Sequence, residues 1–308
     1  MKRALILGIN GTFGSHVAGA LIEKGYTLRA LVRNQKQLNE GLAGVEQVVG
    51  SVADPMILAE VAKGCELVVY GVNPAAYDWE HKALPWLENV ARLAEEKAMT
   101  LVFPGNVYVY DPAEGSQFSE ESKLHPVSRL GAIRKSMEQR LRVASENGAQ
   151  VIIVRAGDFI AADAKSAWLQ SLLKRSKKGY LLTSPGDREV KHSWAYLPDL
   201  AATVAELVAQ RGEMSAFNEF HFKGYQYSIA QMASTIEQVT GKPVKITGFP
   251  WFVIRLIAPF SVLYRGLYEM RYLWQTEINL SEEKLTSQIN KTLPHTPLSR
   301  ALQDAALI

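Results

Sequence analysis

Short apolar runs alternate with amphipathic stretches through the first half of the chain. Apolar side chains that recur at helical spacing predict helices over 15–22, 55–63, 83–97 and 128–147. Short runs rich in apolar and β-branched residues predict buried strands at 4–7, 27–32, 45–49, 67–70, 100–103 and 151–154. Because strands and helices alternate, we expect an α/β fold, with a doubly wound parallel sheet of six or seven strands and helices on both faces.

The pattern changes after Arg155. Residues 157–163 have loop character, and a helix is then expected to end in the basic cluster 174–178, where the helix dipole favours cations. Another helix is expected to begin at Pro198. The rest of the chain is predicted to be helical, apolar and rich in aromatic residues.

These changes divide the chain into two parts. We expect a first domain over 1–157, with 190–212 returning to it, and a smaller, mostly helical lobe over 158–308. This lobe would cover the carboxyl ends of the parallel strands, where open α/β sheets bind their ligands. We therefore expect the lobe to hold the substrate.

A glycine-rich turn, Gly8-Ile-Asn-Gly-Thr-Phe-Gly14, joins the first predicted strand to the first predicted helix. A bound pyrophosphate needs a sharp turn, close approach of the backbone, and a helix N-terminus with free N–H groups. The strand before the turn and the helix after it indicate a dinucleotide-binding, Rossmann-type domain, and an ordinary strand–helix turn is the alternative. The expected cofactor contacts in this turn are Gly8, Asn10, Gly11, Thr12, Phe13 and Gly14.

The second predicted strand leads into Arg33 and Asn34, which we expect to contact the cofactor. A site for NAD usually places a carboxylate here to hold the ribose 2′-hydroxyl, whereas an arginine suits the 2′-phosphate of NADP. NADP(H) is therefore expected in preference to NAD(H). A solvated loop arginine is the alternative.

Composition narrows the classes of protein. Of 308 residues, 47% are hydrophobic and 21% are charged, which is typical of a globular protein. A formal charge of +3, with no basic arm, gives no support for a nucleic-acid partner. The single cysteine, Cys65, excludes an internal disulfide framework and a cysteine-cluster metal site, and we expect no metal. The first strand follows Met1 too closely for a signal peptide, so a cytoplasmic location is expected.

One apolar segment, 249–264, needs a separate interpretation. It is short for a membrane span and is interrupted by Arg255 and Pro259, so we expect no span. A buried or partner-facing helix pair is preferred to membrane association. A homodimer formed through residues 251–274 is one arrangement that the sequence allows.

The spacing Gly-x-x-Gly-x-x-Gly resembles that of the extended and atypical short-chain dehydrogenase/reductase superfamily, in its NAD-dependent epimerase/dehydratase group. Later segments are similar to further motifs of that family, in the same order along the chain: 50–54, 70–73, 155–160, 196–201, 280–285 and 293–298. The resemblance covers essentially the whole chain. It implies that the adenine lies against Ser51 and Val52, and that the loop under the cofactor contains Gly71, Val72 and Asn73.

The family's chemistry uses a serine or threonine after the fifth strand and a Tyr-x-x-x-Lys motif on the next helix. Matched residue by residue, these positions hold Asn106, Leu130 and Arg134 in this chain. Leu130 cannot transfer a proton, and Arg134 could hold the nicotinamide ribose but not act as a base. Asn106 could hydrogen-bond a carbonyl and stays a catalytic candidate. The family's usual tyrosine mechanism therefore does not carry over.

Two further catalytic candidates are Tyr108 and His192. Tyr108 follows the fifth strand, whereas Tyr110 matches a structural tyrosine of the family and is expected to pack. His192, Asp158 and His125 lie at predicted strand ends that face the cleft, and a neutral histidine is a good acid or base near pH 7. A structural or substrate-contacting role is the alternative for each of them.

Three functions are compatible with these residues. The first, which we prefer, is an NADP-dependent oxidoreductase or epimerase-like enzyme that acts on a carbonyl or sugar-like small molecule through a non-standard acid/base. The second is a non-catalytic regulator that senses NADP(H) and signals to a partner, as the fungal nitrogen-repression regulators in the atypical branch of the family do. The third is an assembly protein that is stabilised by the nucleotide.

Overall fold

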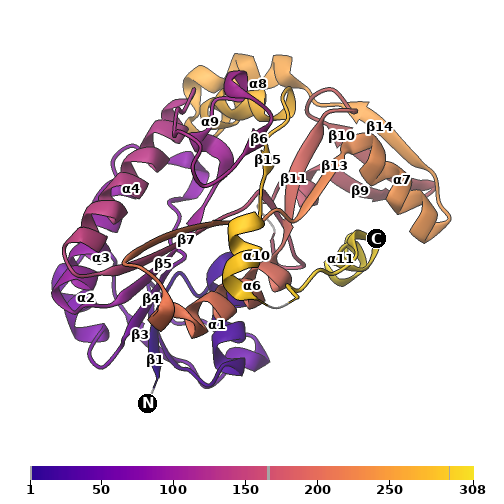
Figure 1. The fold of residues 1–308 in the computed structure, drawn as a ribbon. Helices are drawn as coiled ribbons and strands as arrows, with labels where there is room; N and C mark the ends of the chain where they lie inside the picture. Colours follow the sequence, from indigo (N-terminus) through magenta and orange to yellow (C-terminus); the bar gives the residue numbers. More distant parts are fainter. Residues whose placement is uncertain (1, 165–166, 291) are drawn as a thin grey trace.

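A computed structural model describes residues 2–164, 167–290 and 292–308 of the chain. Its centre is a seven-stranded parallel sheet in the order β12-β7-β5-β4-β1-β2-β3 (Figure 1). The α/β class and the expected number of strands are confirmed. The strands are β1 (Arg3–Leu7), β2 (Thr27–Val32), β3 (Glu46–Val49), β4 (Leu67–Tyr70), β5 (Thr100–Gly105), β7 (Gln150–Arg155) and β12 (Phe217–His221).

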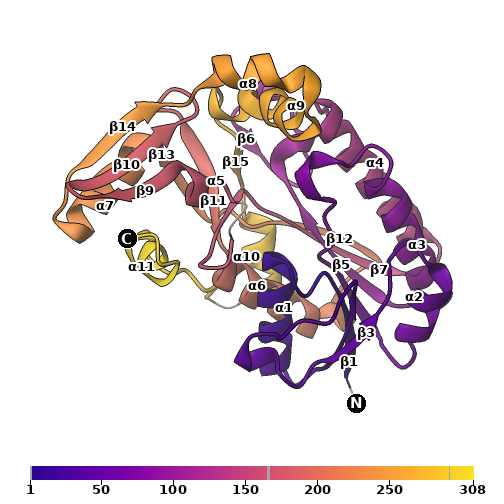
Figure 2. The same cartoon turned by 180° about the vertical axis from the view of Figure 1, so that it is seen from behind.

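Helices cover both faces of the sheet (Figures 1 and 2). On one face, α1 (Thr12–Glu23) packs against α6 (Leu197–Ala209), and α10 (Glu283–Ile289) lies beside them. The other face carries α2 (Pro55–Val61), α3 (Ala83–Glu96) and α4 (Arg129–Glu146).

The alternation of side chains along β1 explains the two layers. Ala4 and Ile6 belong to the core under α1 and α6, whereas Leu5 and Leu7 belong to the core under α3 and α4. All four are fully buried, because a parallel strand between two helical layers has no solvent face. The short apolar runs of the sequence have this origin.

The chain crosses over at β1, since β2 and β3 lie on one side of it and β4 and β5 on the other. Ligands of open α/β sheets bind outside the carboxyl ends of the strands at such a switch point. The glycine-rich turn lies at this position, directly after Leu7.

A second group of elements packs around its own core beyond the carboxyl ends of the sheet. One three-stranded sheet contains β9 (Leu173–Ser176), β10 (Gly179–Ser184) and β14 (Val244–Gly248). Another contains β8 (Asp158–Ile160), β11 (Lys191–Tyr196) and β13 (Tyr225–Ser228). Helices α5 (Trp168–Leu172), α7 (Ile229–Thr240) and α11 (Leu298–Asp304) contribute to the same core. The paired short strands β6 (Gln117–Phe118) and β15 (Asn279–Leu280) bury Phe118 and Leu280 in the core under α3 and α4 instead.

The prediction of a helix end at the basic cluster 174–178 is wrong. Helix α5 ends at Leu172, and residues 173–176 form β9, which turns back into β10. Gly179 has φ +144°, and a Cβ there would lie 2.1 Å from the carbonyl oxygen of Pro243. A glycine at this position therefore favours a hairpin over a continued helix.

The prediction that the chain is helical after residue 201 also needs correction, because β12, β13 and β14 lie in this region. In β13, aromatic and polar residues alternate with the period of a strand. In β12, the polar residues Asn218 and Glu219 are buried, so the strand has no simple apolar pattern.

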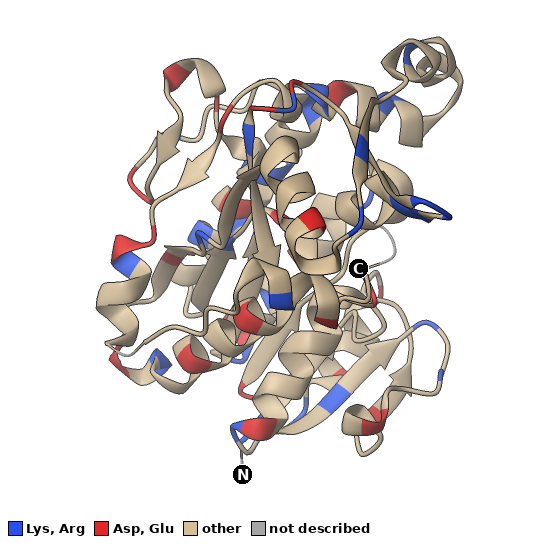
Figure 3. Ribbon diagram, turned by 90° about the vertical axis from the view of Figure 1, so that its right-hand side faces the viewer, with Lys and Arg blue, Asp and Glu red and all other residues tan. Residues whose placement is uncertain are grey.

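The apolar segment forms a helical hairpin of α8 (Trp251–Ile257), a 3-10 turn (Ala258–Phe260) and α9 (Val262–Glu269). The expected helix pair is therefore present, but many of its apolar side chains are exposed rather than buried. Within the described ranges, the structure contains no helix that is both long and apolar enough to cross a membrane. Along the ribbon in Figure 3, acidic and basic positions are interspersed.

Candidate dinucleotide and substrate site

The glycine-rich turn packs tightly against the loop that follows β4. Gly8 has φ +88°, and a Cβ on it would lie 2.5 Å from the carbonyl oxygen of Gly71. A Cβ on Gly14 would lie 2.4 Å from the carbonyl oxygen of Gly8. The Gly11 N–H donates to Gly8 O at 2.8 Å, and the Gly71 N–H donates to Leu7 O at 2.7 Å. Side chains are excluded here, so the backbone itself forms the surface at this edge of the sheet.

The N-terminus of α1 is suited to an anion. Its N-cap is Gly11, with no side-chain cap and no acidic residue in the first turn, as far as the described part of the chain shows. The first backbone N–H groups of a helix have no partner within the helix and carry its positive dipole end. A pyrophosphate therefore fits at this turn.

Residues at the start of α1 contact β8 and the loop that follows it. Phe13 is buried and stacks on Phe159, with ring centroids 6.4 Å apart. Asp163 accepts from the Ser15 hydroxyl at 3.3 Å and lies 3.0 Å from His16 Nε2. These contacts connect the first turn of α1 with the second group of elements.

The other residues predicted to contact the cofactor also lie at this edge. Arg33 and Asn34 are exposed directly after β2, and the Gly50 N–H donates to Val32 O at 2.9 Å, which brings Ser51 alongside. The remaining predicted contacts lie at the ends of the same neighbouring strands: Asn10 and Thr12 in the glycine turn, Val52 after β3, and Gly71, Val72 and Asn73 after β4. Their contact with a nucleotide stays a prediction.

Arg134 is buried beside the end of β5. Its guanidinium lies 4.4 Å from the ring centroid of Phe103 and 5.9 Å from that of Trp79, and Nη2 donates to the Pro104 carbonyl. Burial lowers the pKa of Arg134 to about 10, so it stays charged at neutral pH. Among the described residues, its buried Nε has no hydrogen-bond partner, which leaves one donor for a bound group. Leu130, one turn earlier, is fully buried.

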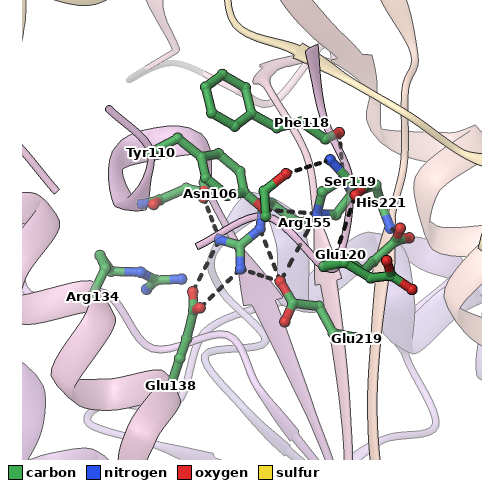
Figure 4. Close-up of polar contacts among 12 residues, drawn as sticks. Asn106, Tyr110, Phe118, Ser119, Glu120, Arg134, Glu138, Arg155, Glu219 and His221 are labelled. Atoms are coloured by element: carbon green, nitrogen blue, oxygen red, sulfur yellow. Dashed lines mark hydrogen bonds and ion pairs between the residues drawn. The ribbon is translucent and has the colours of Figure 1, made fainter. Parts of the chain in front are cut away.

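A buried ionic cluster lies under the site at the end of β7 (Figure 4). Arg155 is fully buried and donates to Glu138 Oε2 at 2.8 Å and Oε1 at 3.1 Å, and also to Glu219 Oε1. Burial alone would raise the pKa of Glu219, but the Arg155 guanidinium lowers it to about 2. The cluster fixes the catalytic candidate Asn106, because Arg155 Nη1 donates to its carbonyl oxygen.

The expected packing role of Tyr110 is confirmed. It is fully buried, its ring stacks on Phe118 with centroids 4.5 Å apart, and its hydroxyl is 2.9 Å from His221 Nε2. Asn106 has a local role as well, since its Oδ1 accepts from the Tyr108 N–H at 3.2 Å and caps the 3-10 turn Val107–Val109.

Tyr108 belongs to a group of polar and aromatic side chains outside the end of β5. Its ring stacks on Trp79 with centroids 6.3 Å apart, and its hydroxyl interacts with Tyr77 and lies in the field of Asp158. Burial, followed by the fields of Tyr77 and Asp158, raises the pKa of Tyr108 well above 10. Burial likewise raises the pKa of Tyr77 to about 12. Both phenols are therefore protonated at neutral pH.

His192 lies on β11 and reaches the same group through Asp158. Its Nε2 is 2.6 Å from Asp158 Oδ2, and its ring stacks on Trp274 with centroids 4.0 Å apart and an interplanar angle of 3°. The ring is buried, so its contact with Asp158 restrains the position of that carboxylate. His125, by contrast, is exposed and bonded to Glu114 on the surface, away from this group.

The family model of the RmlD substrate binding domain matches residues 1–251. The chain belongs to this family. The resemblance to epimerase/dehydratase proteins of the short-chain dehydrogenase/reductase type is thereby confirmed. No curated protein sequence matches the chain.

Solved structures share the fold over almost the entire chain of this RmlD-type protein. A putative epimerase from Burkholderia cenocepacia J2315 has a TM-score of 0.79 at 15% identity, covering 99% of this chain and 98% of its own. UDP-glucose 4-epimerase from Thermotoga maritima, solved with UDP-glucose, has a TM-score of 0.71 at 15% identity, and the match covers 98% of this chain and 97% of the epimerase. dTDP-glucose 4,6-dehydratase from Bacillus anthracis, solved with NAD, has a TM-score of 0.74 at 13% identity, and the match covers 99% of this chain and 95% of the dehydratase. At these identities the similarity shows the fold alone.

Sequence reasoning missed two members of the site of this RmlD-type chain, Tyr77 and Trp79. Tyr77 ends a short 3-10 turn after β4 (Ala75–Tyr77), in which Ala76 and Tyr77 have φ of 56° and 57°, and Trp79 follows two residues later. In the sequence they appear as two aromatic residues between a predicted strand and a predicted helix. Aromatic residues in such a place more often have a packing role than a functional one.

Proposed function

We propose that this protein is an NADP(H)-dependent oxidoreductase of the epimerase/dehydratase type, acting on a small carbonyl or sugar-like substrate. The observation that carries the proposal is the backbone-lined glycine turn at the N-terminus of α1, located at the switch point of the sheet. The dinucleotide in the similar dehydratase and the nucleotide sugar in the similar epimerase support both ligand classes.

NADP(H) would supply the hydride chemistry, and the chain would bind and orient it. The turn from Gly8 to Gly14 would hold the phosphates through backbone N–H groups, and Arg33 would pair with the 2′-phosphate. Arg134 would hold the ribose on the nicotinamide side with the donor that has no protein partner.

The proposed proton donor is the Tyr108 hydroxyl. Its raised pKa keeps the proton on the oxygen at neutral pH, so it would act as an acid rather than as a base. Asp158, held by His192, would accept hydrogen bonds and orient the phenol or the substrate hydroxyl. This arrangement favours reduction of a carbonyl, in which the substrate oxygen gains a proton.

Replacing Arg33 with Asp should change cofactor preference. Loss of a charge-assisted contact with the 2′-phosphate, together with repulsion from the new carboxylate, should weaken NADPH binding by about tenfold or more and improve NADH binding. Calorimetric titration of both cofactors measures the change. Replacing Lys97, an exposed cation at the end of α3, with Asp should leave both affinities unchanged. Equal effects of the two substitutions would remove Arg33 from the site.

Replacing Tyr108 with Phe should lower kcat about 100-fold or more, because a general acid contributes at least that much, and should leave NADPH affinity unchanged. The reaction is measured by NADPH consumption with a panel of aldehydes, ketones, quinones and nucleotide sugars. The matched control is Tyr180→Phe, at a buried tyrosine of β10 in the second core. Full turnover by Tyr108→Phe would refute the proposed acid, and NADPH binding without turnover on any substrate would favour a regulator.

A further inference from the structure

The outer side of the α8–α9 hairpin carries an unusual concentration of exposed apolar side chains. Among the described residues, thirteen large hydrophobic side chains are exposed, and seven of these lie within residues 252–263. Figures 1 and 2 show the hairpin at the rim of the molecule, at the top of both views. The seven residues are Phe252 (73% exposed), Val253 (48%), Leu256 (58%), Ile257 (37%), Phe260 (89%), Val262 (39%) and Leu263 (37%). We call this set the α8–α9 face.

The hairpin is anchored from its inner side, so this exposure is part of an ordered structure. Ile254 is buried, and the Trp251 indole N–H donates to the Pro185 carbonyl. Gly266 of α9 packs closely against Tyr77, and Glu269 accepts from the Leu130 N–H at 2.9 Å. The exposed residues of α8, at 252, 253, 256 and 257, share the opposite side of the helix.

The exposed charges of the hairpin have one sign, because Glu269, at the end of α9, is half-buried and paired with the Leu130 N–H and with Arg129. The sequence contains no aspartate or glutamate between Glu237 and Glu269, but it contains four cations there: Lys242, Lys245, Arg255 and Arg265. Arg255 and Arg265 are exposed on the two helices of the hairpin itself. An amphipathic element with exposed phenylalanine and leucine, whose exposed charges are cations, has the composition of a helix that lies in a membrane interface.

We propose that the α8–α9 face docks on the surface of an anionic lipid bilayer. Phe252, Leu256 and Phe260 enter the boundary between headgroups and acyl chains, and the two arginines pair with lipid phosphate and carboxylate groups. A second copy of the chain fits this face less well, because a contact of hairpin with hairpin would offer Arg255 and Arg265 no exposed carboxylate of the hairpin as a partner. The docking is peripheral, in agreement with helices too short to cross a bilayer in the described part of the chain.

The test is co-sedimentation of the full chain with vesicles of phosphatidylcholine, with and without about 30% phosphatidylserine. The wild-type chain should sediment with the anionic vesicles and be released by high salt. Phe260→Asp should lower the partition coefficient by at least about tenfold, and Arg255→Gln by about fivefold, the amount expected for one cation near an anionic surface.

The matched control is Met56→Asp, at an apolar side chain on α2 that is 83% exposed and lies outside the α8–α9 face. It should sediment like the wild type, and thermal melting should show that Phe260→Asp is as stable as this control. Three results would overturn the proposal: no sedimentation of the wild type with anionic vesicles, equal sedimentation of Phe260→Asp and Met56→Asp, or a dimer in solution that Phe260→Asp dissociates. The last result would assign the face to a second copy of the chain.

Discussion

Replacing Gly14 with Ala should lower the affinity for NADPH by at least about 100-fold. The new Cβ would lie 2.4 Å from the carbonyl oxygen of Gly8, so the turn must move away from the N-terminus of α1. Losing two charge-assisted hydrogen bonds to phosphate, at roughly 1.5 kcal/mol or more each, corresponds to this factor. Titration followed by NADPH fluorescence measures the change.

The matched control lies in the same helix. Gly19 is within α1, and in the described part of the chain a Cβ there would meet no heavy atom within 4 Å. Gly19→Ala should therefore keep wild-type affinity and stabilise the helix by up to about 1 kcal/mol. Thermal melting separates loss of binding from loss of folding. Equal NADPH affinities of Gly14→Ala and Gly19→Ala would remove the turn from the cofactor site.

Replacing Arg155 with Met should destabilise the protein by about 3–5 kcal/mol, because it leaves Glu138 and Glu219 buried without their cation. The carbonyl of Asn106 would lose its donor in the same step, so activity should fall as well. Chemical unfolding followed by circular dichroism measures the change in the free energy of unfolding.

An exposed ion pair provides the comparison for this large effect. Glu60 in α2 forms an ion pair with Lys63, which follows the end of this helix. The side chains of Lys63 and Glu60 are 66% and 69% exposed. Lys63→Met should change the free energy of unfolding by less than about 0.5 kcal/mol, since exposed pairs contribute little. If Arg155→Met were as mild as Lys63→Met, the buried cluster would not hold the site in place.

Local patterns predicted the framework of the site. Apolar runs between amphipathic helices predicted six of the seven central strands and missed β12. The glycines of the first turn lie where a Cβ would meet the backbone of Gly71 or Gly8. These features depend on neighbours in the sequence and on steric rules that hold in any fold. The glycine turn and the strands around it are therefore the part of the candidate site that local patterns predict best.

The proposed acid/base group depends on contacts that no local pattern contains. Tyr108 meets Tyr77 and Asp158 only because the ends of β4, β5 and β7 lie side by side. His192 pairs with Asp158, which is 34 positions away, and packs on Trp274, which is still farther away in the sequence. Arg155 and Glu219 are charged, so the sequence pattern predicts exposed positions, yet both side chains are buried in the core.

The most direct test of the central claim is calorimetric titration of the purified wild-type chain with NADPH, and separately with NADH. We expect saturable binding of one NADPH per chain, with NADH binding more weakly, because in the proposed site the glycine turn would accept the pyrophosphate and Arg33 would pair with the 2′-phosphate. Absence of binding for both cofactors would contradict the account at the glycine turn.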